Sequence, residues 1–106
     1  MPLQEAAFHI LVALGDSDKH GYAIMQDVAD RTDGNVRLNA GTLYTTIRRL
    51  LDQGLIIELD ERPDADDERR RYYRLTAAGR REVAEEASRL QRMLKLAKAA
   101  GLGPRG

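Results

Sequence analysis

The stretch NAGTLYTTIRRLLDQGLI, residues 39–56, decides the fold. Asn39 is a favourable N-cap and Gly54 suits a left-handed C-cap, so we predict a helix from Ala40 to Gln53. At about 100° per residue, its aliphatic side chains share one face and its polar side chains share the opposite one. The aliphatic face consists of Leu43, Ile47, Leu50 and Leu51. The outward side carries Thr45, Arg48, Arg49 and Asp52, with Thr42 and Tyr44 flanking them.

After Gly54 the pattern changes to the period of a strand. Leu55, Ile57 and Leu59 alternate with Ile56, Glu58 and Asp60. This alternation predicts a strand. A polar segment, ERPDADDERR, separates it from RYYRL at residues 71–75, which predicts a second strand with Tyr73 and Leu75 on one face. The two strands form a hairpin with a long charged tip.

The flanking segments are helical. Apolar residues at helical spacing predict one helix from Leu3 to about Leu14, which residues 15–18 (GDSD) end, and a second from Gly21 to Arg31. Residues 36–38 form a short extended piece. Thr76 is placed to N-cap a last helix that reaches about Ala100.

The order of elements is three helices, a hairpin and a helix. It predicts a mainly α fold with a small β-hairpin, of the α+β class, arranged as a winged helix-turn-helix with a C-terminal dimerisation helix. We expect residues 1–75 to form the DNA-binding domain, residues 76–100 the dimerisation helix and residues 101–106 a flexible tail.

Composition removes several classes of function. The 106 residues fit one domain, and the absence of cysteine excludes disulfides and thiolate chemistry. No apolar stretch is long enough to span a membrane and the start does not read as a signal peptide, so a cytoplasmic protein is expected. Seventeen basic and seventeen acidic residues cancel, but an acidic block (residues 58–68) and a basic block (residues 69–74) stand apart. A local patch can therefore still bind phosphate.

The outward side of the 40–53 helix suits duplex DNA. A guanidinium group can hydrogen-bond a guanine edge or a phosphate, and threonine offers a hydroxyl and a methyl group. Backbone amides at the start of the helix can also bind a phosphate. The alternative is an ordinary solvated face of an amphipathic helix. The order of helices and hairpin around it favours DNA binding over this alternative.

The hairpin tip is a second candidate contact. Arg62 opens the loop, and residues 69–71, all arginine, close it. Arginine can enter the minor groove or lie along phosphates, but the four acids between these residues oppose such contact. A solvated tip whose charges pair with each other is the alternative.

Three segments in this order, HGYAIMQDV (20–28), LNAGTLYTTIRRLLDQGLI (38–56) and RRRYYRLTAAGR (69–80), resemble the PadR family of bacterial transcriptional regulators. The resemblance covers roughly Leu3 to Arg81 and implies a homodimeric winged-helix repressor whose recognition helix enters the major groove. The hairpin is more acidic than in such proteins, and the single last helix resembles the short-tailed branch. By position, the expected DNA-binding residues are Asn39, Thr42, Tyr44, Thr45, Arg48, Arg49, Arg62, Arg69, Arg70 and Arg71. For Tyr44, a packing role stands as the alternative.

The last helix carries a second apolar pattern. Residues spaced alternately by four and three positions form what we term the seam of this helix, namely Val83, Ala87, Leu90, Leu94 and Ala97. Such spacing is typical of a helix that meets another helix, here one from a partner chain, with packing onto its own domain as the alternative. The first helix offers a matching set of residues, Leu3, Ala7, Ile10 and Leu14. A two-fold dimer would read an inverted repeat.

Regulators of this family respond to small molecules, so the resemblance also implies an effector. Phe8 and Met93 are candidates to line its site, with plain core positions as the alternative. No cofactor or metal site is expected. An enzyme is disfavoured because His9 and His20 are the only histidines. Neither is placed to act as the base of a catalytic triad with the Gly15–Ser17 motif. Their spacing also matches no known arrangement of metal ligands. A winged-helix module that binds protein remains the rival function.

Overall fold

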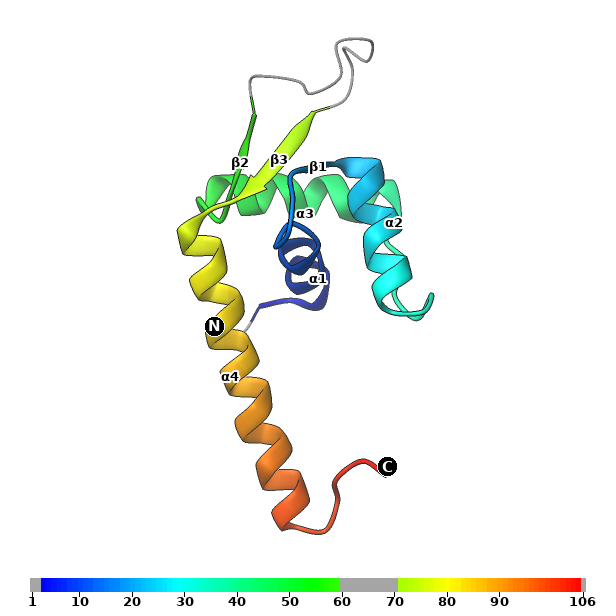
Figure 1. The fold of residues 1–106 in the computed structure, drawn as a ribbon, viewed down its shortest axis with the longest axis vertical. Helices are drawn as coiled ribbons and strands as arrows, with labels where there is room; N and C mark the ends of the chain where they lie inside the picture. Colours follow the sequence, from blue (N-terminus) through cyan, green and yellow to red (C-terminus); the bar gives the residue numbers. More distant parts are fainter. Residues whose placement is uncertain (1–2, 60–70, 106) are drawn as a thin grey trace.

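The computed structural model of the chain describes residues 3–59 and 71–105. Four helices and three short strands follow one another within these residues (Figure 1). They are α1 (Glu5–Ala13), β1 (Lys19–His20), α2 (Gly21–Arg31), α3 (Ala40–Asp52), β2 (Ile56–Glu58), β3 (Tyr72–Leu75) and α4 (Ala77–Ala99). No helix among these residues has the length and apolar character needed to cross a bilayer.

Local capping chemistry defines the helix ends, as predicted. The Asn39 side-chain oxygen accepts the Thr42 N–H at 2.8 Å, and the Thr76 hydroxyl accepts the Gly79 N–H at 3.0 Å. Each of these contacts satisfies a backbone donor that has no partner within its helix. At the other end of α3, Gly54 takes a φ of 73°, the left-handed cap that the sequence indicates.

The sheet has one strand more than the predicted hairpin. Its order is β1-β3-β2, and both pairings are antiparallel. Lys19 and His20 of β1 pair with Tyr73 and Tyr72 of β3. His20 also caps α2, because its Nδ1 accepts the Ala23 N–H at 3.1 Å. The extra strand therefore attaches the start of α2 to the hairpin.

The two hairpin strands differ in how well the alternation predicts their faces. In β3, Tyr73 and Leu75 are buried together, as predicted. In β2 the inward residue is Ile56, which follows the buried Leu55 directly, whereas Ile57 is 45% exposed. The strand begins only after the Gly54 turn, and Leu55 enters the core from that turn. Leu55 and Ile57, which the alternation places on the same side of the strand, therefore do not share one buried face.

The core lies where α1, α2 and α3 meet the inner face of the sheet. Its side chains are aliphatic apart from Tyr73, and the largest fully buried ones are Ile10, Leu11, Ile24, Val28, Leu43, Ile47, Leu50 and Ile56. Leu51, assigned to the inward face of α3, is only partly buried at the edge of this core. Thr46, which the helical face did not include, is buried.

Polar contacts hold the turn between α1 and β1. Lys19 Nζ donates to Asp16 Oδ1 at 2.7 Å and to Ser17 Oγ at 3.0 Å, and its hydrogen bond lowers the pKa of Asp16. The Arg74 guanidinium donates two hydrogen bonds to the Asp18 carboxylate, which lowers the pKa of that group and joins the turn to β3. The residues of the Gly15–Ser17 motif thus belong to a structural turn.

Helix α4 leaves the body of the protein after its first turns. Ala78 and Val83 pack against the core, and Glu86 is buried beside the start of the chain. Beyond this point the helix extends away from the other elements (Figure 1). Its 23 residues correspond to about 35 Å at 1.5 Å per residue. Most of its second half therefore has no support from its own chain.

Gly79 provides a direct test of how α4 packs on the sheet. A Cβ at this position would overlap the backbone oxygen of Leu55 and lie 2.5 Å from Leu75 Cδ1. We expect Gly79→Ala to destabilise the fold by about 1–3 kcal/mol, because overpacking forces backbone shifts. Urea unfolding at fixed protein concentration measures this change. Gly41→Ala is the matched control, because Gly41 lies in the exposed first turn of α3 and alanine favours helix by up to about 1 kcal/mol. Equal effects of the two substitutions would contradict the packing described here.

Candidate nucleic-acid interface

The outward side of α3 is exposed as the sequence predicts. Thr42, Tyr44, Thr45, Arg48 and Arg49 are all accessible to solvent, while Leu43, Ile47 and Leu50 face the core. Asn39 is exposed too, but its side-chain oxygen is occupied by the cap, which leaves only its amide N–H groups for a further partner. The helix thus presents hydroxyls and guanidinium groups on a face that folding leaves uncovered.

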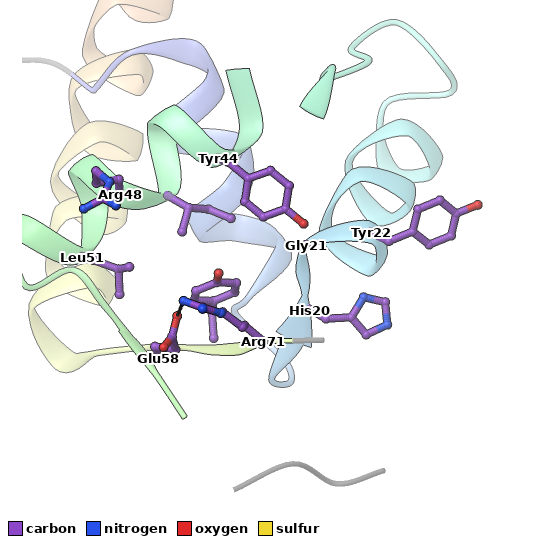
Figure 2. A pocket seen from close by; sticks show the side chains of 10 residues that line it. His20, Gly21, Tyr22, Tyr44, Arg48, Leu51, Glu58 and Arg71 are labelled. Atoms are coloured by element: carbon purple, nitrogen blue, oxygen red, sulfur yellow. Dashed lines mark ion pairs between the residues drawn. The ribbon is translucent and has the colours of Figure 1, made fainter. Parts of the chain in front are cut away.

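The two arginines of α3 lie on different flanks of this face. Arg49 Nη1 donates to Gln4 Oε1 at 2.7 Å, so this side chain points toward the start of the chain. Arg48 lies on the opposite flank, where it lines the edge of a groove between α3 and the sheet (Figure 2). Arg48 forms no ion pair or hydrogen bond within the described part of the chain. Of the two, Arg48 is the cation that a ligand can reach without breaking a contact.

The groove has a volume of about 740 Å³. Its walls come from the start of α2, from α3 and from the two hairpin strands, and Figure 2 shows Tyr44, Glu58 and Arg71 around it. The lining residues are His20, Gly21, Tyr22, Tyr44, Ile47, Arg48, Leu51, Glu58, Arg71 and Tyr73. Three tyrosines and two arginines in one groove combine hydrogen-bond donors with positive charge.

Tyr44 has both of the roles that the sequence left open. Its ring lies over Gly21, where a Cβ would come 2.5 Å from the phenol oxygen, so the ring packs against the start of α2. The residue nevertheless remains 52% exposed. Gly21 is the small residue that permits this approach. Tyr44 therefore forms one wall of the groove and still offers its hydroxyl to a ligand.

The floor of the groove carries an ion pair. Arg71 Nη1 lies 3.5 Å from Glu58 Oε1, and Figure 2 marks this pair. Burial, followed by the charge of Glu58, raises the pKa of Tyr73, so its phenol stays protonated at neutral pH. Glu58 partly neutralises Arg71, and Arg48 adds a positive charge that has no partner among the described residues. The groove as a whole therefore favours an anion.

Of the predicted hairpin contacts, only Arg71 lies in the described part of the chain, where it lines the groove. Arg62, Arg69 and Arg70 lie outside the described residues. Sequence reasoning did not select Glu58, Tyr22 or Gln4. The β2–β3 register could have indicated Glu58, since Tyr73 pairs with it.

The dimerisation residues proposed for α1 require a correction. Ala7, Ile10 and Leu14 are buried in the core of their own chain, with Ile10 fully inaccessible, and Leu3 is partly buried against that core. Ala7, Ile10 and Leu14 are already used within the fold and have almost no surface to offer a partner, whereas Leu3 keeps part of its surface. The spacing that suggested an interface is the core-facing stripe of α1.

On α4, part of the predicted seam is exposed. Leu90 and Leu94 are 44% and 40% exposed, and the neighbouring Met93 is exposed as well. Ala87 is also exposed, and Ala97 is half-buried. Val83 is the exception, because it packs against its own core.

The proposed effector residues lie apart from the groove. Phe8 is half-buried on α1 and meets the ring of His9 edge-on, while Met93 Sδ lies 2.9 Å from Arg89 Nη1 on α4. Neither residue lines the groove beside α3. Among residues 3–59 and 71–105, no group of three or more histidine, aspartate or glutamate side chains is placed to hold a metal ion.

Comparisons with known proteins agree with this fold. The chain is 33% identical over 87 residues to the transcriptional regulator Rv3488 of Mycobacterium tuberculosis, a match that covers 82% of this chain and 77% of that protein. A transcriptional regulator from Clostridium thermocellum superimposes with a TM-score of 0.75 at 26% identity, over 88% of this chain and 89% of that one.

The structure of Bacillus subtilis PadR in complex with operator DNA superimposes with a TM-score of 0.68 at 20% identity. That match covers 79% of this chain and 47% of the Bacillus protein. A family profile described as the transcriptional regulator PadR-like family matches residues 10–85, which is most of the chain. The protein is an α+β winged helix-turn-helix chain that belongs to the PadR-like family of transcriptional regulators, a family of regulators and not of enzymes.

Proposed function

We propose that this protein is a DNA-binding repressor that recognises an inverted-repeat operator as a homodimer and is released from it by a small-molecule effector. The observation that carries the proposal is the face of α3. Thr45 and Arg48 are exposed there, beside a groove that favours an anion, and Arg48 has no partner within residues 3–59 and 71–105. The operator complex of the Bacillus relative supports the same use of the fold.

The geometry assigns separate tasks to the face and to the groove. The 13 residues of α3 extend about 20 Å and fit a major groove about 12 Å wide, where Thr45 and Arg48 meet base edges. The groove between α3 and the hairpin then receives the sugar-phosphate backbone beside that major groove. Tyr44 and Arg71 are its donors toward a phosphate. Phosphate contacts of this kind fix the position of the protein, while the base contacts select the sequence.

Two copies are needed because one α3 helix reads only a short site. The exposed leucines of α4 supply an apolar surface for a second α4, and a two-fold axis would place two α3 helices about 34 Å apart, one turn of DNA. An effector that enters between the chains would change this spacing and so weaken operator binding. Repression by occupying the operator is the simplest outcome of such binding.

A selection of bound sequences from random duplex DNA tests this function. We expect an enriched inverted repeat with half-sites about one helical turn apart. Affinity for that site should fall with added salt, by about 0.9 log units per log unit of salt for each phosphate contacted. A module that binds only protein would enrich no sequence, and that result would exclude the proposal.

A further inference from the structure

The start of the chain lies between the proposed DNA-reading helix and the proposed dimerisation helix. Gln4 and Arg49 are 45 positions apart in sequence, yet their side chains meet in a hydrogen bond of 2.7 Å. Gln4 is also the N-cap residue of α1, although its side chain makes no capping hydrogen bond. The Gln4 amide is therefore directed at α3 instead of at its own helix.

Leu3, the preceding residue, is fixed from the other side. Its side chain packs against the core, and its backbone lies close enough to the Glu86 carboxylate on α4 to lower the pKa of that group. Glu86 is buried and accepts two hydrogen bonds from Arg89, at 2.9 Å from Nε and 2.6 Å from Nη2. Arg89, and then this backbone contact, hold the pKa of Glu86 below its ordinary value, so the anchor stays ionised at neutral pH. In Figure 1, the segment just before α1 runs toward α4.

We propose that Gln4 is a positioning residue for operator recognition, which holds the Arg49 guanidinium in the orientation that DNA binding requires. The inference rests on the proposed function and adds a residue outside α3 to it. Because Leu3 packs against the core and its backbone lies beside Glu86, the same two-residue segment connects the orientation of Arg49 to the position of α4.

The physical reason for such a positioning role is the conformational freedom of an exposed arginine side chain. A free side chain of this length populates many rotamers, and ordering one on binding costs affinity. The Gln4 oxygen restricts Arg49 before DNA arrives, because Gln4 is itself held by α1 on one side and by the anchored Leu3 on the other. The amide oxygen accepts one N–H and leaves the remaining guanidinium donors directed outward, since Arg49 is exposed.

Gln4→Met tests the hydrogen bond alone, because methionine keeps the length of the side chain and removes the acceptor. We expect about two- to tenfold weaker binding to the selected operator, with the thermal midpoint unchanged because both residues are exposed. In the Arg49→Ala background the same substitution should have no further effect, since its target is gone. Gln53→Met, at the exposed glutamine that follows α3, is the matched control and should bind as wild type.

The single and double substitutions at Gln4 and Arg49 distinguish the possible outcomes as follows. Equal operator affinity of Gln4→Met and wild type would overturn the positioning role, and so would tighter binding by the variant. A loss of the same size in the Arg49→Ala background would show that Gln4 acts through something else, and would overturn it too. Failure of the wild-type protein to bind any selected duplex would instead refute the proposed function, which keeps the two failures distinct.

Glu86→Gln extends the test to the anchor. The amide removes the charge that holds Arg89 and the Leu3 backbone, while it preserves the size of the side chain. We expect Glu86→Gln to weaken operator binding in the wild-type background. In the Gln4→Met background, it should cause no further loss of operator affinity. An additive loss in that pair would mean that the anchor does not act through Gln4, and would overturn the connection to α4.

Discussion

Leu90→Asp is expected to convert the protein into a monomer and to weaken operator binding by about two to four orders of magnitude. Leu90 is 44% exposed on the part of α4 that its own chain does not cover, so aspartate disturbs the isolated fold little. In a helix-to-helix interface, however, it would bury two unpaired carboxylates, which is strongly unfavourable. Operator affinity falls because each monomer must then bind its half-site alone, without the linkage that holds two half-site contacts together in the dimer. Sedimentation at several concentrations and operator titration measure the two effects.

Leu102→Asp is the control for this substitution. Leu102 is a leucine of 79% exposure that follows the end of α4, outside the seam. The Leu102→Asp substitution should leave both the dimer and operator binding intact. A Leu90→Asp protein that sediments as a dimer would exclude α4 as the interface. A monomeric variant with wild-type operator affinity would instead show that the dimer has no part in DNA recognition.

The sequence predicts most of the helical structure because the helix ends are set by neighbouring residues. Asn39 and Thr76 cap helices through backbone donors only three positions away. Strand β1 was missed for the opposite reason. It consists of Lys19 and His20 alone, too short for any alternation, and its partners Tyr72 and Tyr73 lie more than 50 positions away.

The candidate site was predictable only in part for a similar reason. The exposed face of α3 follows from helical periodicity, whereas the groove depends on how α2, α3 and the hairpin meet. Neither the proximity of Tyr44 to Gly21 nor the Gln4–Arg49 hydrogen bond leaves a signal at fixed spacing. The misassigned residues of α1 show a further limit, because an apolar stripe on a helix looks the same whether its own core or a partner covers it. Ile10 belongs to the core.

Arg48→Ala is expected to weaken operator binding by about 1–3 kcal/mol per half-site and to relax base preference at one position in each. Arg48 is the α3 cation with no partner of its own in the described part of the chain, so DNA gains the full contact without first breaking another. Arg49 already gives one N–H to Gln4 and keeps only its remaining donors for DNA, so Arg49→Ala should cost less. Titration against the selected operator and its single-base variants measures affinity and preference together.

Two further variants separate a base contact from simple charge. Arg105→Ala removes one exposed positive charge from the segment after α4, and it should leave operator affinity unchanged. Arg48→Lys keeps the charge at the site but loses the planar fork that binds guanine through two hydrogen bonds. If Arg48 reads a base edge, the lysine variant will bind more weakly and with reduced preference at the same position as Arg48→Ala. Full recovery of affinity and preference by lysine would assign Arg48 to a phosphate, and sequence recognition by α3 would then depend on Thr45 and its neighbours.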